Sequence, residues 1–135
     1  MALLVLDSWP LTAYFEQEPA AVRVREILEG SLRGEHELYL SVVNLGEVMH
    51  IRERRHGAFA AQAALSVIDQ YLVRTVDVDR EFALAAARIK TTQNLAYADC
   101  FAVALARRLR ATILTGDPDF RRVEGMVSIE WLRPQ

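Results

Sequence analysis

Four acidic residues stand where the chemistry of a metal site could be built. Two of them follow short apolar runs and two lie near the start of long helical patterns; they are Asp7, Asp117, Glu47 and Asp99. Carboxylates gathered without a basic neighbour repel one another, and a bound divalent cation is the usual way to stabilise them. Ligands that are all oxygen suit Mg²⁺ or Mn²⁺. The leading hypothesis is therefore metal-assisted cleavage of phosphodiester bonds.

Each acid also has a purely structural explanation. Asp7 and Asp117 precede expected helix starts, where a carboxylate can cap the free N–H groups. Glu47 follows Asn44 at the spacing of a capping box. Asp99 falls in the first turn of a helix, where a negative charge meets the positive end of the helix dipole. The metal hypothesis therefore depends on the four acids taken as a set.

The surroundings of the acids favour a shared metal site over separate helix caps. Glu47 and Asp99 are flanked by apolar residues, and a carboxylate in apolar surroundings is seldom left unpaired. Asp7 and Asp117 follow runs that are typical of central strands. In open parallel sheets, ligands bind outside the carboxyl ends of the strands, which is where both acids are expected.

Strand-like and helix-like patterns alternate along the chain. Strands are expected at 2–6, 38–40, 73–78, 111–115 and 126–131, and helices from Ser8, from Pro19, and over 42–55, 58–71, 80–91 and 97–110. This alternation predicts an α/β fold with three layers, α/β/α, around a central, mostly parallel sheet of four to five strands. We expect residues 1–135 to form a single domain, because the length fits one core and no linker or repeat is visible.

Composition excludes several classes of protein. The 135 residues are 52% hydrophobic, so disorder is not expected. The net charge is −2, so a nucleic-acid partner would have to be held by a local basic patch. Cys100 is the only cysteine, which excludes an internal disulfide and a cysteine-based zinc site. No apolar stretch approaches about 18 residues and no signal peptide is visible, so we expect a cytoplasmic protein without a membrane span.

Four motifs, in this order and spacing, resemble a known family. They are LLVLDS at 3–8, SVVNLGEV at 41–48, YADCFAVALA at 97–106 and TGDPDF at 115–120. The chain resembles a PIN domain, and more narrowly the VapC-type ribonuclease toxins of bacterial and archaeal toxin–antitoxin pairs. The resemblance implies a parallel α/β sheet and a metal-dependent endoribonuclease that uses Mg²⁺, with Mn²⁺ as a substitute.

The resemblance also assigns roles and partners. Carried over position by position, the catalytic and metal-binding acids are Asp7, Glu47, Asp99 and Asp117, and the supporting residues are the hydroxyls of Ser8 and Thr115, the amide of Asn44, and Asp119 as a further ligand or outer acid. The family implies an RNA substrate and a small antitoxin that inserts into or covers the active cleft. Family members are commonly dimers, so a homodimer is expected.

Two positions depart from the family pattern, and both flank expected site residues. The pair Trp9-Pro10 is bulkier and stiffer than is usual after the first acid, and Gly116 stands where a polar residue is frequent. Trp9 could stack on a base or belong to the core or a dimer contact. Among the basic residues, Arg121 and Arg122 are the expected contacts to RNA phosphates. The alternative is that they are solvated charges at a helix end.

Other functions fit less well. A receiver domain would need a paired acid near the first strand and a late lysine, whereas Asp7 stands alone and Lys90 falls in a helix. A haloacid-type phosphatase would need Asp-x-Asp, which the chain lacks after Asp7. A non-catalytic PIN-like module that binds RNA or protein remains the alternative. Metal binding would distinguish it from the nuclease.

Overall fold

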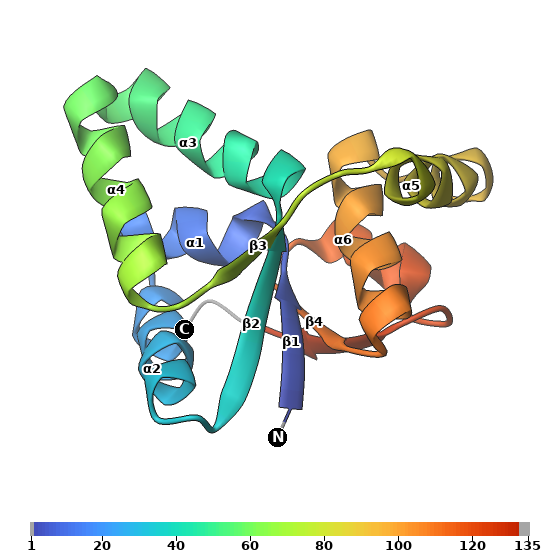
Figure 1. Cartoon of the computed structure of the whole chain (residues 1–135), viewed down its shortest axis with the longest axis horizontal. Helices are drawn as coiled ribbons and strands as arrows, with labels where there is room; N and C mark the ends of the chain where they lie inside the picture. The colour runs from blue at the N-terminus through green and yellow to red at the C-terminus, as the bar shows by residue number, and fades with distance from the viewer. Residues whose placement is uncertain (1, 133–135) are drawn as a thin grey trace.

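The fold was analysed in a computed structural model that describes residues 2–132 (Figure 1). The elements follow one another as β1 Ala2–Leu6, α1 Ser8–Phe15, α2 Ala21–Leu32, β2 His36–Ser41, α3 Val42–His56, α4 Ala58–Gln70, β3 Arg74–Val76, α5 Arg80–Thr92, α6 Tyr97–Leu109, β4 Thr112–Thr115, the 3₁₀ helix η1 Pro118–Val123 and β5 Ser128–Trp131. The alternation that the sequence predicts is confirmed.

The five strands form one parallel sheet in the order β3-β2-β1-β4-β5. The chain builds the sheet outward from β1 in one direction and then, from β4 onward, in the other. In register, Leu6 at the end of β1 lies opposite Leu40 of β2 and Leu114 of β4. The carboxyl ends of the three central strands therefore meet at one edge.

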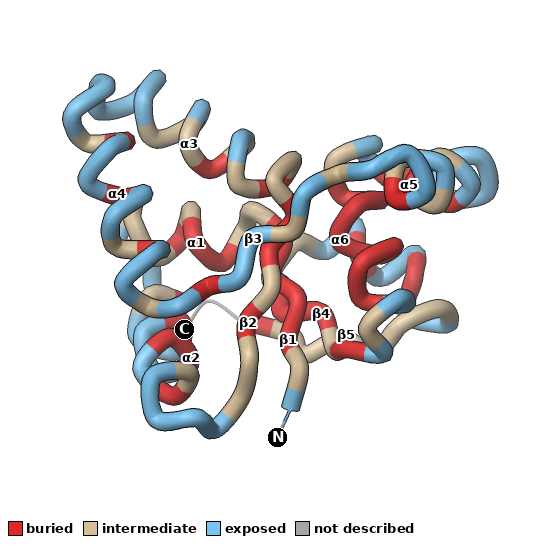
Figure 2. The backbone as a smooth tube through the Cα atoms, in the orientation of Figure 1, coloured by how far each residue is buried: buried red, intermediate tan, exposed pale blue. Residues whose placement is uncertain are grey.

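Each face of the sheet carries its own core, because successive side chains of a strand point to opposite faces. Val5 and Ile113 pack with α5 and α6, whereas Leu4 and Leu6 pack with the helices α1 to α4. Figure 2 shows buried backbone concentrated in β1, β4 and α6. The predicted three-layer α/β/α architecture is confirmed, and β1, which precedes Asp7, is at its centre.

β2 is longer than the strand predicted at 38–40, because it runs over His36–Ser41, and α2 begins at Ala21 and not at Pro19. The two edge strands also differ from the prediction. β3 is shorter than predicted, because only three of its residues pair with β2. β5 begins at Ser128 and not at Met126, because the backbone N–H groups of Met126 and Val127 both donate to the carbonyl of Val123 in a turn. Neither difference touches the residues of the candidate site.

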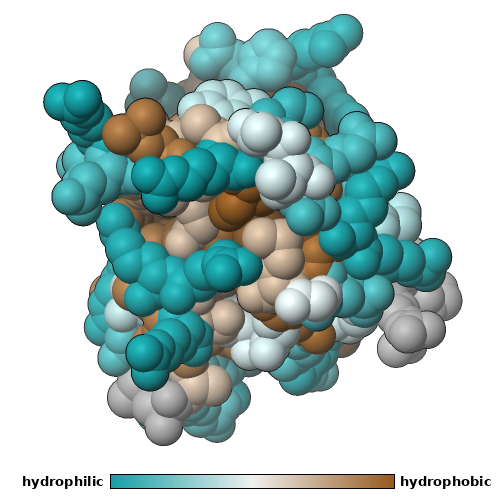
Figure 3. Space-filling view, turned by 90° about the vertical axis from the view of Figure 1, so that its right-hand side faces the viewer, coloured by the Kyte–Doolittle hydropathy of each residue, from teal (hydrophilic) through white to brown (hydrophobic). Residues whose placement is uncertain are grey.

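The surface formed by α5 and α6 mixes hydrophilic side chains with smaller hydrophobic areas (Figure 3). Among the helices of residues 2–132, none has the length and apolar character that a membrane span requires.

Candidate metal centre

The candidate site lies between β1 and β4, at the point where the strand order reverses. Asp7 directly follows β1, and Asp117 follows β4 after a single intervening residue. The segments that follow β1 and β4 pack on opposite faces of the sheet, and in open parallel sheets ligands bind at such a point, outside the carboxyl ends of the strands. Asp99, in the first turn of α6, is brought to the same place.

Three of the four predicted acids converge. Carboxylate oxygens of Asp7, Asp99 and Asp117 all lie within 4.8 Å of one another. Asp7 is 1% exposed and Asp99 is 8% exposed, whereas Asp117 is only partly buried. The cluster is therefore closed at its base by Asp7 and open on the side of Asp117.

Asp7 is held by β4 and does not cap α1. The hydroxyl of Thr115 donates to Oδ2 of Asp7 at 2.9 Å, and the same hydroxyl oxygen accepts the backbone N–H of Asp117 at 3.1 Å. Although Asp7 occupies the N-cap position of α1, its carboxylate accepts no N–H of that helix. The capping explanation for Asp7 is therefore wrong, and the side chain is free to face the cluster.

The other carboxylate oxygen of Asp7, Oδ1, is buried without any hydrogen-bond partner. A buried polar atom without a partner costs free energy, and a charged one costs more. Among the described residues, no lysine or arginine forms an ion pair with any of the three clustered acids. A divalent cation that prefers oxygen ligands would complete this arrangement, so the residues fit Mg²⁺ or Mn²⁺.

The pKa values of the clustered acids also favour a bound cation. Burial raises the pKa of Asp7 well above its usual value, and the nearby Asp99 and Asp117 raise it further, while the hydrogen bond from Thr115 lowers it. Burial, with the negative charges of Asp117 and Glu47, raises the pKa of Asp99 to about 7. Both shifts describe the chain without a cation. A bound cation would favour the ionised carboxylates and reverse them.

Glu47 lies beside the three-acid cluster and is not one of its members. The side-chain amide of Asn44 donates to Oε1 of Glu47 at 3.1 Å and to the backbone carbonyl of Ala98, one residue before Asp99, at 3.2 Å. Asn44 therefore links the start of α3 to the start of α6. The supporting role that the resemblance implies for Asn44 stays a prediction.

Ser41 is a further residue of this network that the sequence analysis missed. Its hydroxyl accepts the backbone N–H of Asn44 at 3.1 Å and donates to Oδ1 of Asn44 at 2.8 Å. The cap of α3 is therefore Ser41, and the prediction of a capping box that begins at Asn44 is wrong. The signal was present, because a serine three residues before a polar residue at a strand-to-helix junction is a typical N-cap.

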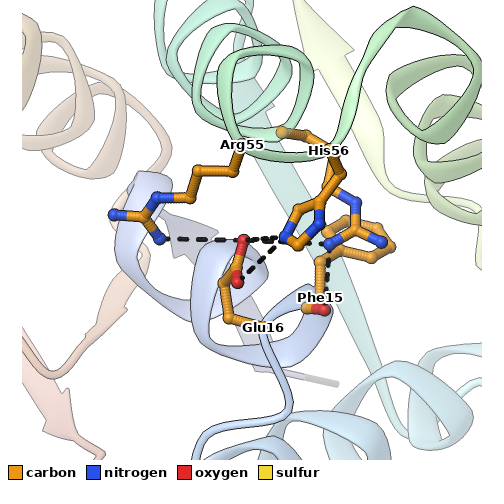
Figure 4. A network of polar contacts seen from close by, with 5 residues as sticks. Phe15, Glu16, Arg55 and His56 are labelled. Atoms are coloured by element: carbon orange, nitrogen blue, oxygen red, sulfur yellow. Dashed lines mark hydrogen bonds and ion pairs between the residues drawn. The ribbon is translucent and has the colours of Figure 1, made fainter.

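The far end of α3 is tied to the end of α1 by a second polar network (Figure 4). Oε1 of Glu16 lies 3.7 Å from a nitrogen of Arg52, 3.7 Å from one of Arg55 and 3.1 Å from Nε2 of His56. Arg52 also donates to the carbonyl of Phe15 at 3.2 Å and stacks over its ring. This network therefore ties the end of α1, the helix that follows Asp7, to α3, the helix that carries Glu47.

The remaining predicted residues lie in η1, which follows β4, and at the start of α1. The carboxylate of Asp117 accepts the N–H of Asp119 at 2.9 Å and so caps η1, in addition to facing the cluster. Asp119 is exposed and pairs with Arg122 at 3.1 Å. Arg121 is also exposed and forms no ion pair within residues 2–132. Ser8, the first residue of α1, is half-buried next to Asp7.

Comparison with known proteins places these observations in a family. A family model described as PIN domain matches residues 4–126. No curated protein matches the chain at the significance required.

Several solved structures share the fold. The toxin VapC20 of Mycobacterium tuberculosis, described as cleaving the sarcin–ricin loop, has a TM-score of 0.73 at 19% identity, over 94% of this chain and 98% of that one. VapBC2 of Rickettsia felis, bound to a promoter DNA fragment, has a TM-score of 0.72 at 15% identity, over 97% and 99%. A toxin–antitoxin complex from Klebsiella pneumoniae has a TM-score of 0.71 at 17% identity, with full coverage of both chains.

Proposed function

Since the chain belongs to the PIN-domain family, we propose that it is a metal-dependent endoribonuclease that acts as the toxin of a type II toxin–antitoxin pair. The observation that carries the proposal is the convergence of Asp7, Asp99 and Asp117 within 4.8 Å around a buried carboxylate oxygen that has no partner. A site of this kind needs a cation, and a phosphodiester can approach it only after the charge of the acids has been neutralised.

The structural neighbours support the biological role in the proposal. Besides the toxin that cleaves the sarcin–ricin loop, several of them are complexes between a toxin and its antitoxin. By analogy, the substrate of this chain is RNA and its partner is a small antitoxin that covers the carboxylate cleft. A homodimer is proposed on the same analogy.

The roles of the residues follow from their contacts. Asp7, Asp99 and Asp117 would hold Mg²⁺ or Mn²⁺, and Glu47, held by Asn44, would join them directly or through water. The cation would supply charge neutralisation at the phosphate and a more acidic water. Thr115 keeps Asp7 oriented, and the partly exposed Asp117 is on the side from which RNA can enter. Attack by water on the phosphorus atom, in line with the leaving 3′-oxygen, leaves a 3′-hydroxyl and a 5′-phosphate.

A cleavage assay tests the enzymatic part of the proposal. Purified protein with Mg²⁺ or Mn²⁺ should cleave at least one member of a panel of structured RNAs, and a chelator should stop the cleavage. Asp7→Asn should lower the rate by a factor on the order of 100 or more, because it removes an anionic ligand from the centre of the site. Equal cleavage by wild type and Asp7→Asn would mean that a contaminant or a different site is responsible.

A metal titration separates the nuclease from the non-catalytic alternative. Calorimetry with Mn²⁺ should show saturable binding by wild type and much weaker binding by Asp99→Asn. If neither protein binds Mn²⁺, the four acids are structural and the chain is a PIN-like binding module.

A further inference from the structure

Trp9 lies directly against the backbone of Gly116. A Cβ atom added to Gly116 would overlap the ring atom Cη2 and lie 2.5 Å from both Cζ2 and Cζ3. Separations under 3.0 Å are essentially never found for real Cβ atoms. The indole ring therefore fills the space that any side chain at position 116 would need.

This contact joins the two segments that carry Asp7 and Asp117. Trp9 is the second residue of α1, two positions after Asp7, and Gly116 is the residue between Thr115 and Asp117. On one side of Gly116, the carbonyl of Thr115 accepts the backbone N–H of Leu132 at 2.8 Å. On the other side, Asp117 caps η1. The ring of Trp9 therefore contacts the turn at Gly116, whose two ends are held by the Thr115–Leu132 hydrogen bond and by the cap at Asp117.

Among the other glycines, only Gly30 shows a comparably close approach. A Cβ atom on Gly46 or Gly125 would meet nothing within 4 Å. One on Gly30 would meet the end of the Glu35 side chain and the His36 ring at the start of β2. The indole ring of Trp9 is rigid, half-buried and packed against the core on the α1 side of the sheet. It cannot swing aside as the end of a long side chain can.

We propose that Trp9 is a positioning residue, which sets the separation between the carboxylates of Asp7 and Asp117 by resting on Gly116. This inference rests on the proposed function, since the separation matters only if the two acids share a cation. Mg²⁺ requires oxygens at about 2.0–2.1 Å in near-octahedral geometry, so a small displacement of the turn weakens binding. The two departures from the family pattern, at Trp9 and at Gly116, are then explained by one contact.

A double-mutant cycle tests the proposal, with Mn²⁺ affinity measured by calorimetry in the full chain. Gly116→Ser should weaken Mn²⁺ binding by about tenfold or more, since the turn must move away from the ring. Trp9→Ala alone should weaken it by a smaller factor, because the turn loses its support. Trp9→Ala combined with Gly116→Ser should bind Mn²⁺ more tightly than Gly116→Ser alone.

The decisive result is that the effect of Trp9→Ala on Mn²⁺ affinity changes sign with the residue at position 116. Trp9→Ala is harmful when position 116 is glycine and beneficial when it carries a side chain, whereas independent effects would simply add. Gly125→Ser is the matched control, because it adds the same side chain where space is open, and its affinity should equal that of wild type. Circular dichroism checks that each variant is folded, and Gly116→Ala, a smaller insertion, replaces Gly116→Ser in the cycle if that variant does not fold.

The outcomes separate this inference from the proposed function. If wild type does not bind Mn²⁺, the proposed function fails and the positioning role fails with it. If wild type binds Mn²⁺ and the effects of the two substitutions add, the proposed function stands and the role of Trp9 is refuted.

Discussion

At the scale of single residues, the site consists of carboxylates that the fold holds at a cost. Asp7 is buried, accepts one hydrogen bond from Thr115 and has one oxygen without a partner. Such a group is stable when it is protonated or when a cation binds it. Stability and metal binding should therefore be linked through pH.

The raised pKa of Asp99 gives this link a direction. Without metal, the folded chain keeps a proton on Asp99 up to a pH of about 7, whereas the unfolded chain loses it near 3.8. The resulting stabilisation is complete below the lower value and is lost as the pH rises through the higher one. A shift of this size corresponds to roughly 4 kcal/mol.

Urea unfolding in the presence of a chelator measures the effect. Relative to Asp99→Asn, wild type should lose stability as the pH rises from about 4 to about 7. Saturating Mn²⁺ should reverse the trend for wild type, since the cation competes with the proton for the same oxygens. A difference between the two proteins that does not change with pH would show that Asp99 is not protonated in the folded chain.

Thr115 is the second residue whose contribution can be isolated. Its hydroxyl is the only hydrogen-bond partner of the Asp7 side chain among the described residues, and it also accepts the N–H of Asp117. Thr115→Val keeps the shape and removes both bonds, so Mn²⁺ affinity should fall by about 10- to 100-fold. Thr112→Val, at the other end of β4, is the matched control and should keep the affinity of wild type.

At the scale of elements, the site depends on a polar chain that connects α3 to α6. Ser41 caps α3 and orients Asn44, which in turn holds Glu47 and the carbonyl of Ala98. Ser41 at the end of β2 and Asn44 in the first turn of α3 thus form a hydrogen-bonded path to Ala98, the residue before Asp99. The position of Glu47 is set by this path.

Asn44→Ala breaks the path while the cap at Ser41 remains. The free energy of unfolding should fall by about 1–3 kcal/mol, because buried partners lose their hydrogen bonds. Mn²⁺ binding should weaken as well if Glu47 contributes to the site, and thermal unfolding with calorimetry measures both. Asn94→Ala, at an exposed position before α6, should change neither quantity. Unchanged Mn²⁺ affinity in Asn44→Ala would remove Glu47 from the set of ligands.

The sequence predicted the elements well because their signals are local. The apolar run before Asp7 matches β1, and the helices predicted at 58–71 and 80–91 match α4 and α5 to within one residue at each end. The lengths of β2, β3 and β5 were predicted less well, since a strand ends where its neighbour ceases to pair with it. That information is not in the strand itself.

The candidate site was predictable for a different reason. A parallel sheet brings the carboxyl ends of its strands together, so Asp7 and Asp117 could be expected to meet before any coordinates were known. The contact between Trp9 and Gly116 could not be expected, because it joins residues far apart in the chain and depends on the direction of one ring. The exclusion of Glu47 from the closest cluster depends in the same way on side-chain geometry.

At the scale of the whole molecule, the proposed binding of RNA would have to overcome an unfavourable overall charge. The net charge is −2, and the acid cluster adds local repulsion. Of the two arginines expected to contact phosphates, Arg122 is already paired with Asp119, whereas Arg121 is exposed and has no ion pair among the described residues. Arg121 is therefore the better candidate for contact with a phosphate near Asp117.

A salt titration of RNA affinity tests this choice, with Asp7→Asn as the background so that the RNA is not cleaved. Arg121→Ala should weaken binding and lower the slope of log K against log salt by about 1, as expected for the loss of one phosphate contact. Arg122→Ala should have a smaller effect, because its charge is partly neutralised by Asp119.

The matched control is Arg33→Ala. Arg33 follows α2, precedes the amino end of β2 and pairs with Glu35 at 3.0 Å, so it lies at the edge of the sheet opposite the acids. An equal loss of slope in Arg121→Ala and Arg33→Ala would show a response to overall charge and would leave Arg121 without a specific role.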